Sequence, residues 1–230
     1  MEIKDKIYEG STKNLYATDN EEQLVLEFTD KFVSGKQKET ISGKGAINKE
    51  LCTRFFEYLQ SYNVPTHFIK SVDETRILVK KLEMIPFTVQ IWNIAGDSLA
   101  KRLGLKEGTV LETPVLELYL KNAKLKNPLI NDYHAYSLKL CDRDEMNAII
   151  RMTTKVNAVL KSYFMRKKMT LAHFTLEFGR SGSQILLGDE LSLDNMFVIE
   201  GLNMEEADYN QFVMDSSNAK KLYSKLKEQI

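Results

Sequence analysis

The chain has 230 residues with 32 basic and 32 acidic side chains, so its formal net charge is zero. Hydrophobic residues make up 43% of it and charged residues 28%, with only 11 glycines and 4 prolines. This composition is typical of a globular protein and excludes long disorder, a collagen-like repeat and a disulfide scaffold. Balanced charge argues against nucleic acid or an anionic membrane surface as a partner, because both favour a cationic excess.

The cysteines and the N-terminus predict a cytoplasmic protein. Cys52 and Cys141 stand apart, without the CxxC or Cys/His spacing of zinc sites, and are expected to be buried thiols in a reducing compartment. The N-terminal residues have no apolar signal core, and charges interrupt every candidate membrane span.

The first part of the chain is predicted to consist mainly of antiparallel strands. Short alternations of apolar and polar residues separated by turn residues favour strands, and the turn Gly10-Ser11-Thr12-Lys13 is typical of a hairpin. Apolar residues four apart predict one helix, over residues 46–62. The predicted strands cover residues 6–9, 15–18, 24–28, 66–71 and 76–82.

The second part mixes helices and strands. Asp97 is expected to cap a short helix that ends at Gly104. Asp142 followed by Glu145 predicts a capping box at the start of a long helix that ends near Arg166. The remaining predicted elements are a hairpin over residues 171–178 and 184–189 and a terminal helix over 218–230.

This order of elements predicts an α+β protein with two lobes and a cleft between them. Residues 1–84 form the expected antiparallel β lobe, and residues 85–230 form the expected mixed α/β lobe.

The strand 171–178 carries a candidate site. Its alternation places His173, Thr175 and Glu177 on the face opposite the apolar residues. Asp189 and Asp194 follow in the next strand and loop. Carboxylates that converge from neighbouring strands can bind Mg²⁺ together with nucleotide phosphates, although a solvated polar face would show the same pattern.

Two further segments have residue types that suit a nucleotide. The turn from Gly10 to Lys13 offers backbone N–H groups and one ammonium to a phosphate, but it is not a Walker A loop. Residues 80–84 end a strand, so that backbone groups there can pair with an adenine edge while Leu82 and Met84 pack on its face. Trp92 can stack on a ligand or pack in the core.

In this order, several segments resemble the SAICAR synthetase (phosphoribosylaminoimidazole-succinocarboxamide synthase) family of purine biosynthesis. They span roughly residues 7 to 195 and are YEGSTKNLYAT, GKGAINKEL, VPTHFI, LVKKLEMIP, GDSLAKRLG, NPLIND, LEFG and GDELSLD. The resemblance implies the two-lobed SAICAR-synthetase fold with an ATP cleft. It also implies a ligase that uses ATP and Mg²⁺ to join carboxyaminoimidazole ribotide (CAIR) to L-aspartate through an acyl phosphate.

The resemblance assigns roles to residues on both sides of the expected site. Lys13, Glu177 and Asp189 would be catalytic, with the two carboxylates binding the metal. The remaining nucleotide-binding residues would be Gly10, Ser11, Leu24, Lys80, Lys81, Leu82 and Met84. The expected substrate-binding residues are Ser98, Trp92, His173, Thr175, Asp194 and Phe197.

The substrate half of the resembled motifs departs from the family pattern. Ser11, Trp92, Thr175 and Phe197 stand where the family carries a lysine or an arginine, and His173 replaces an aspartate. Tryptophan and phenylalanine cannot replace the planar bidentate donors that arginine offers to anions. A cost on the order of a thousandfold in binding of the usual substrates is expected from three lost charge-assisted contacts.

Three hypotheses follow from this pattern. The first is a SAICAR synthetase with an unusual substrate site. The second is a divergent ligase that retains the ATP and Mg²⁺ site but joins a less anionic acid or another amine. The third is a nucleotide-binding pseudoenzyme, which the retained Lys13, Glu177 and Asp189 disfavour. The resemblance also implies a homodimer, with small molecules as the other partners.

Overall fold

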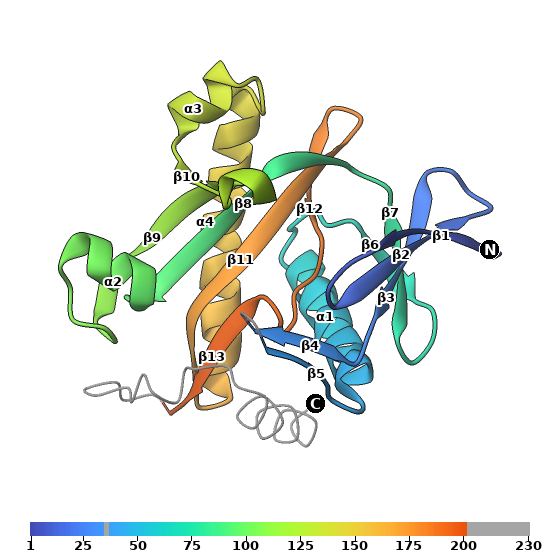
Figure 1. Cartoon of the computed structure of the whole chain (residues 1–230), viewed down its shortest axis with the longest axis horizontal. Coiled ribbons are helices and arrows are strands. Elements are labelled where there is room, and N and C mark those ends of the chain that lie inside the picture. The colour runs from blue at the N-terminus through green and yellow to red at the C-terminus, as the bar shows by residue number, and fades with distance from the viewer. Residues whose placement is uncertain (35–36, 202–230) are drawn as a thin grey trace. The chain divides into compact units, whose positions relative to one another are not determined.

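The structure is a computed structural model that describes residues 1–34 and 37–201 (Figure 1). The described residues form two compact units, one of residues 1–58 and 67–81 and the other of residues 59–66 and 82–201. The predicted lobe boundary between residues 84 and 85 stays a prediction, and the predicted helix 218–230 lies outside the described residues. None of the described helices combines the length and the hydropathy that crossing a membrane requires.

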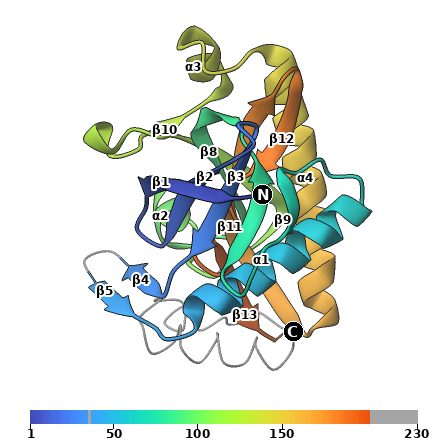
Figure 2. The same ribbon diagram turned by 90° about the vertical axis from the view of Figure 1, so that its right-hand side faces the viewer.

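The first unit is built on a five-stranded antiparallel sheet with the strand order β1-β2-β3-β7-β6. Its central strands β3 and β7 are buried on both faces, with Val25 and Leu78 on one and Leu26, Ile77 and Val79 on the other. A separate two-stranded ribbon and the helix that follows it are visible in Figure 2. The bounds are β1 Ile3–Glu9, β2 Lys13–Thr18, β3 Gln23–Phe28, β4 Lys31–Ser34, β5 Gln37–Thr40, α1 Lys44–Ser61, β6 Phe68–Ser71 and β7 Arg76–Lys80.

The second unit is built on a six-stranded sheet with the order β10-β9-β8-β11-β12, in which β13 also pairs with β11. All of its strand pairs are antiparallel. The strands are β8 Glu83–Ile94, β9 Val110–Leu120, β10 Leu129–Ile130, β11 Met169–Ser181, β12 Gln184–Gly188 and β13 Met196–Glu200. The helices are α2 Asp97–Leu103, η1 Ala123–Leu125, α3 Asp132–Ser137 and α4 Arg143–Arg166.

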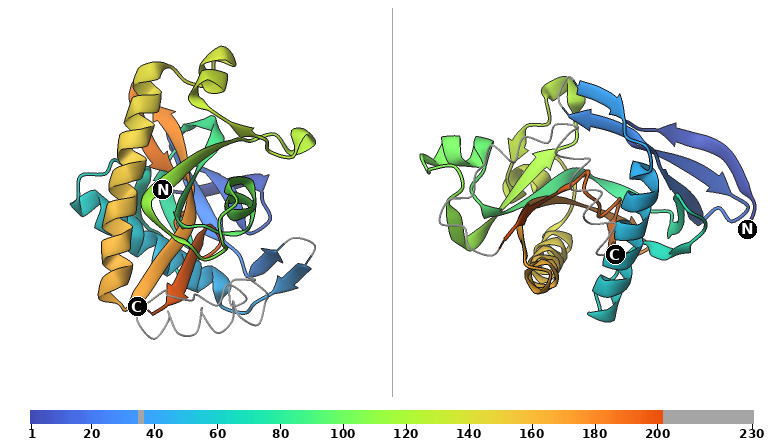
Figure 3. Two further views of the ribbon diagram at one scale, coloured as in Figure 1. Left: turned by 90° about the vertical axis from the view of Figure 1, so that its left-hand side faces the viewer. Right: turned by 90° about the horizontal axis from the view of Figure 1, so that it is seen from below.

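Helix α4 covers one face of this sheet, as Figure 3 shows, and forms the core with it. The predicted apolar face of the helix is buried, from Met146 to Phe164, and it packs against the apolar face of β11. Asp142 and Glu145 exchange backbone and side-chain hydrogen bonds, so the predicted capping box is confirmed. The opposite face of the sheet is therefore the one that carries His173, Thr175 and Glu177.

Several features of the second unit differ from the sequence prediction. Asp97 does not cap α2, because Gly96 occupies the N-cap position and Asp97 is already helical. Strand β8 was not predicted, since Pro86 interrupts the alternation that begins at Glu83, and strands β9, β10 and β13 and helix α3 were not predicted either. The structure accommodates Pro86 in an irregularity of the β8–β11 ladder, where three residues of β8 lie opposite Phe178 alone.

Candidate active site

The hairpin of β11 and β12 brings the two predicted metal carboxylates near each other along the backbone. Glu177 lies opposite Gly188 in the register, and Asp189 is the next residue. Asp189 has a φ of 56°, a left-handed conformation that aspartate adopts more readily than most residues. Two carboxylates from adjacent strand ends are the hard oxygen donors that Mg²⁺ prefers, with phosphate oxygens and water completing the coordination.

Lys121, which the sequence did not single out, reaches Glu177. Its ammonium Nζ lies 2.6 Å from Glu177 Oε2. The Glu177 side chain is 15% exposed and the Lys121 side chain 43% exposed. The backbone N–H of Lys121 donates to the carbonyl of Pro86 at 2.9 Å, so pairing with β8 continues one residue past the end of β9 and holds the Lys121 backbone.

Two glycines allow the predicted adenine-binding residues to lie close to this hairpin. A Cβ on Gly179 would come within 2.7 Å of Leu82 Cβ and 3.1 Å of Met84 Sδ. A Cβ on Gly188 would come within 3.1 Å of Leu82 Cδ1. Residues larger than glycine would therefore displace Leu82 or Met84, which lie beside the strand ends that carry the carboxylates. This contact brings the predicted adenine and metal residues of the second unit together.

The first unit holds the other predicted nucleotide-binding residues at two places in its sheet. At the β1–β2 turn, the N–H of Gly10 donates to the carbonyl of Lys13 at 2.8 Å, which closes the turn around Ser11. Leu24 pairs with Val79 at the other end of the sheet, next to Lys80. The N–H of Lys81 donates to the carbonyl of Glu22 there. Four rungs of the β2–β3 ladder, or about 13 Å, separate the two places.

Trp92, His173 and Phe197 form one aromatic stack on the polar face of the second sheet. Trp92 on β8 and Phe197 on β13 both pair with His173 on β11. The ring centroids of Trp92 and His173 lie 4.5 Å apart, and those of His173 and Phe197 lie 5.2 Å apart with an interplanar angle of 3°. Three positions of the predicted substrate set are thus in direct contact. Thr175 lies next to them on the same face, between His173 and Glu177.

The aromatic stack is buried at one end and electrically neutral. Trp92 is 4% exposed and packs with Leu99 and Ala100 of α2, whereas His173 and Phe197 are half-buried. Burial lowers the pKa of His173 to about 4, because desolvation disfavours the imidazolium. His173 Nδ1 is buried without a hydrogen-bond partner, so a second N–H on the ring would be left unpaired.

Glu117 on β9 links the aromatic stack to α2, the helix that carries Ser98. It accepts a hydrogen bond from the indole N–H of Trp92 at 3.1 Å and another from the hydroxyl of Tyr119 at 2.8 Å. It also forms a salt bridge with Arg102. The bond from Glu117 raises the pKa of the Arg102 guanidinium, and the pKa of the Tyr119 hydroxyl is raised by burial and by Glu117. Glu117 could not be singled out from the sequence, because β9 was not predicted.

The predicted substrate residue Asp194 lies in the loop between β12 and β13. Asn195 ties this loop to β11, since its side chain donates to the carbonyl of Thr175 and its own carbonyl accepts the N–H of Thr175. The N–H of Asp194 donates to the hydroxyl of Ser192 at 3.1 Å. The loop is therefore held beside Thr175 by one side-chain and one backbone hydrogen bond of Asn195, a role that the motif GDELSLD did not reveal.

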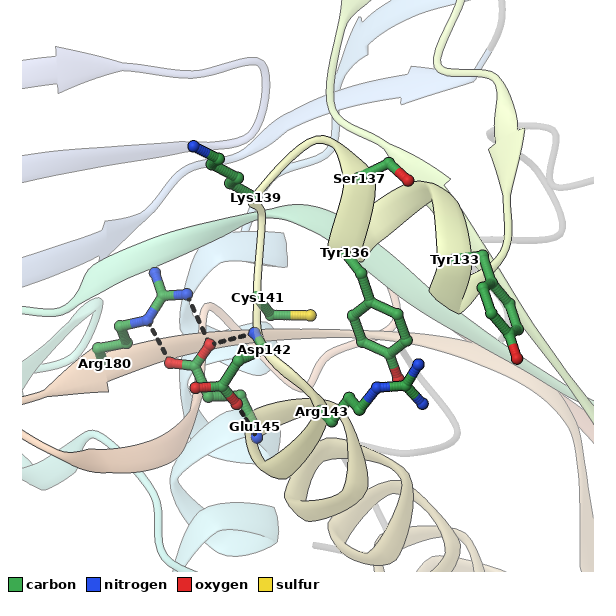
Figure 4. A pocket seen from close by; sticks show the side chains of 9 residues that line it. All are labelled: Tyr133, Tyr136, Ser137, Lys139, Cys141, Asp142, Arg143, Glu145 and Arg180. Carbon is green, nitrogen blue, oxygen red and sulfur yellow. Dashed lines mark hydrogen bonds and ion pairs between the residues drawn. The ribbon is translucent and has the colours of Figure 1, made fainter.

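A separate pocket of about 500 Å³ lies at the start of α4 (Figure 4). Arg180 lines the pocket and donates hydrogen bonds to both carboxylate oxygens of Glu145 and to the carbonyl of Leu140. Burial raises the pKa of the nearby Cys141 thiol to about 11, so this cysteine is an unreactive thiol at neutral pH. None of the predicted site residues lines this pocket. We assign it a structural role at the junction of β11 and α4.

Among residues 1–34 and 37–201 no group of three or more His, Cys, Asp and Glu side chains is arranged to hold a metal. Within these ranges, Glu177 and Asp189 therefore do not belong to a larger cluster of such side chains, and their role as metal ligands stays a prediction.

Comparison with known proteins identifies the family. The SAICAR synthetase family model matches residues 6–229. A phosphoribosylaminoimidazole-succinocarboxamide synthase of Thermoanaerobacter sp. (strain X514) is 40% identical over 225 residues, which are 97% of this chain and 96% of the relative.

Two solved structures extend the match to the whole fold. A SAICAR synthetase in complex with ADP aligns with a TM-score of 0.89 and 36% identity, covering 100% of this chain and 97% of the other. The phosphoribosylaminoimidazole-succinocarboxamide synthase from Ehrlichia chaffeensis aligns with a TM-score of 0.89 and 28% identity, covering 97% of both chains. The fold and the family resemblance predicted from the sequence are confirmed, and the chain belongs to the SAICAR synthetase family.

Proposed function

We propose that this protein is an ATP-dependent ligase that joins the carboxyl group of an acid to an amine and forms an amide. CAIR and L-aspartate are the first pair to test, because the relatives that match almost the full length are named as synthases of the corresponding product. The proposal rests on the sequence match to such a synthase, which extends over 97% of this chain.

The proposed reaction has two steps. A carboxylate oxygen of the acid attacks the γ-phosphorus of ATP, the bond from that phosphorus to the bridging oxygen breaks, and ADP leaves. The amine nitrogen then attacks the acyl carbon, the bond from carbon to the phosphate oxygen breaks, and inorganic phosphate leaves while the nitrogen releases a proton to solvent. Holding acid and amine in contact accounts for much of the acceleration in such a reaction.

Each predicted nucleotide-binding residue has a role in this proposal. Lys13 contacts phosphate oxygens at the β1–β2 turn, and Leu82 and Met84 pack against the adenine. Glu177 and Asp189 would hold Mg²⁺, which neutralises charge on the phosphates when it is bound. The half-buried position of Glu177 supports this role, because its carboxylate is partly desolvated and yet reachable.

The test is an ADP-release assay on the full chain with Mg²⁺·ATP, CAIR and L-aspartate, with the amide product identified by mass spectrometry. We expect ADP release that requires both acid and amine. Omission of either substrate, one at a time, is the control for uncoupled hydrolysis. ADP release without an amide product, or none with a panel of acids and amines, would overturn the proposal.

The proposal includes a cytoplasmic homodimer. Light scattering coupled to gel filtration gives the molar mass directly, and a mass of 26.5 kDa, that of one chain, would overturn the dimer alone.

A further inference from the structure

The aromatic stack of Trp92, His173 and Phe197 lies on the same sheet face as Glu177. His173 precedes Glu177 by four residues on β11, which places their backbones about 13 Å apart on one strand. A substrate whose reacting carboxylate lies near Glu177 would extend along this face toward the half-buried rings of His173 and Phe197.

The charges near the stack are already paired within the second unit. Arg102 forms a salt bridge with Glu117, and Lys121 forms one with Glu177. At the buried end of the stack, the Trp92 indole N–H already donates a hydrogen bond to Glu117. Among the described residues of the second unit, an anion on the stack would have to draw Arg102 or Lys121 away from its carboxylate or remain without a counter-charge, and both are unfavourable.

We propose that this stack determines which acid the enzyme accepts, by offering a neutral aromatic surface to the part of the acid that lies beyond its reacting carboxylate. The preferred acid has an uncharged planar or apolar group at this position. The inference rests on the proposed ligase function and names the substrate class for the same site.

The chemistry of the rings supports this preference. Parallel offset rings, such as His173 and Phe197, extend readily by one further planar group, because aromatic rings favour offset stacking. A phosphate that meets an arginine gains about ten- to hundredfold in affinity for each charge-assisted bond, and a neutral ring offers none of that gain. The stack therefore selects between acids that share a reacting group and differ in this one substituent.

CAIR and its dephosphorylated riboside form the matched pair of probes, since they differ only in the phosphate. We expect kcat/KM for the riboside, with L-aspartate and Mg²⁺·ATP, to equal or exceed that for CAIR. A preference for CAIR of about a hundredfold or more would overturn the inference while leaving the ligase function established.

Turnover is not required for the test. If neither acid releases ADP, the CAIR and L-aspartate pair of the proposed function fails, and the inference is judged by calorimetric binding in the presence of Mg²⁺·ADP. Riboside binding that is equal to or tighter than CAIR binding, or no CAIR binding at 1 mM, would support the neutral surface. CAIR binding at least about tenfold tighter than riboside binding would overturn it.

Phe197→Arg and Phe197→Leu test the surface itself. The arginine variant is expected to raise the ratio of CAIR to riboside binding at least about tenfold, by supplying a cation beside the rings. The leucine variant retains an apolar side chain without a ring and is expected to weaken riboside binding. Tyr133→Leu, which removes an aromatic ring 65% exposed on α3, is the matched control. It should change neither the ratio of CAIR to riboside binding nor the affinity for the riboside. The inference would be overturned if Phe197→Arg left the ratio of CAIR to riboside binding unchanged and Phe197→Leu left riboside binding unchanged.

Discussion

Lys121 Nζ lies 2.6 Å from Glu177 Oε2, so the carboxylate proposed to hold Mg²⁺ has an ammonium partner. Lys121 follows the end of β9, where its N–H donates to the carbonyl of Pro86 and continues the β8–β9 register by one residue. A bound cation would compete with the ammonium for the same oxygen, because like charges disfavour each other at this separation. We therefore expect Lys121, which lies outside the resembled motifs, to influence the affinity for the metal.

Lys121→Met is expected to strengthen Mg²⁺ binding about two- to tenfold, because it removes the competing charge and retains the apolar stem. Titration of Mg²⁺ in the presence of ADP, followed by calorimetry, measures the effect. Lys124→Met, on the exposed η1 helix, is the matched control and should leave the affinity unchanged. Weaker Mg²⁺ binding in Lys121→Met would show that the ammonium contacts the phosphates instead.

Glu177→Gln and Asp189→Asn are each expected to weaken Mg²⁺·ATP binding by at least about tenfold and to lower turnover further. Each change removes a charge with almost no change in size, and asparagine tolerates the left-handed backbone of residue 189 as aspartate does. The midpoint of thermal unfolding without nucleotide serves as the folding control and should stay within a few degrees. Retained binding and turnover in both variants would refute the assignment of these carboxylates to the metal.

The alternation of residues 171–178 was sufficient to predict which side chains share the polar face of β11. Phe174, Leu176 and Phe178 are buried, while Thr175 and Glu177 are half-buried on the other side. That prediction worked because the period of a strand is a local property. The capping box at Asp142 was predictable for the same reason, since its partners are three residues apart.

The partners of the site residues were not predictable, because they depend on pairing between distant strands. Because Pro86 interrupts the alternating pattern, β8 was not predicted. Without β8, the register that places Trp92 beside His173 cannot be deduced. Lys121 and Glu117 belong to β9 or its end, which pairs with β8. Gly179 and Gly188 were visible in the motifs LEFG and GDELSLD, but their function as a close contact for Leu82 requires the folded hairpin.

Arg180→Met is expected to lower the free energy of unfolding by about 2 kcal/mol at pH 7, because Glu145 and the carbonyl of Leu140 lose charge-assisted hydrogen bonds. The hydrogen bond from Arg180 lowers the pKa of Glu145 below its usual range. The stabilisation is therefore complete above the ordinary carboxyl pKa near 4.5 and is lost as the pH falls through the lower folded value.

Urea unfolding of the wild type and Arg180→Met between pH 7 and pH 3 measures this dependence. The difference between the two proteins should shrink below about pH 4.5. Arg151→Met, an exposed position on α4, is the matched control and is expected to change stability by less than about 0.5 kcal/mol. A difference that stays constant with pH would show that Arg180 acts through packing alone.

His173 is expected to make the protein less stable in mild acid. Its pKa is lowered to about 4 by burial, whereas the unfolded chain has an ordinary histidine near 6.5. Between these values the unfolded state binds more protons, so stability is complete above about pH 6.5 and falls as the pH is lowered toward 4. The loss attributable to His173 between pH 7 and pH 5 is on the order of 2 kcal/mol.

His173→Phe, which retains a ring in the stack, is expected to reduce this loss of stability, as measured by urea unfolding at both pH values. His134→Gln, at an exposed position on α3, should leave it unchanged. An identical loss in wild type and His173→Phe would mean that the imidazole in the stack is charged or accessible in the native protein, which would also contradict the neutral surface inferred for it.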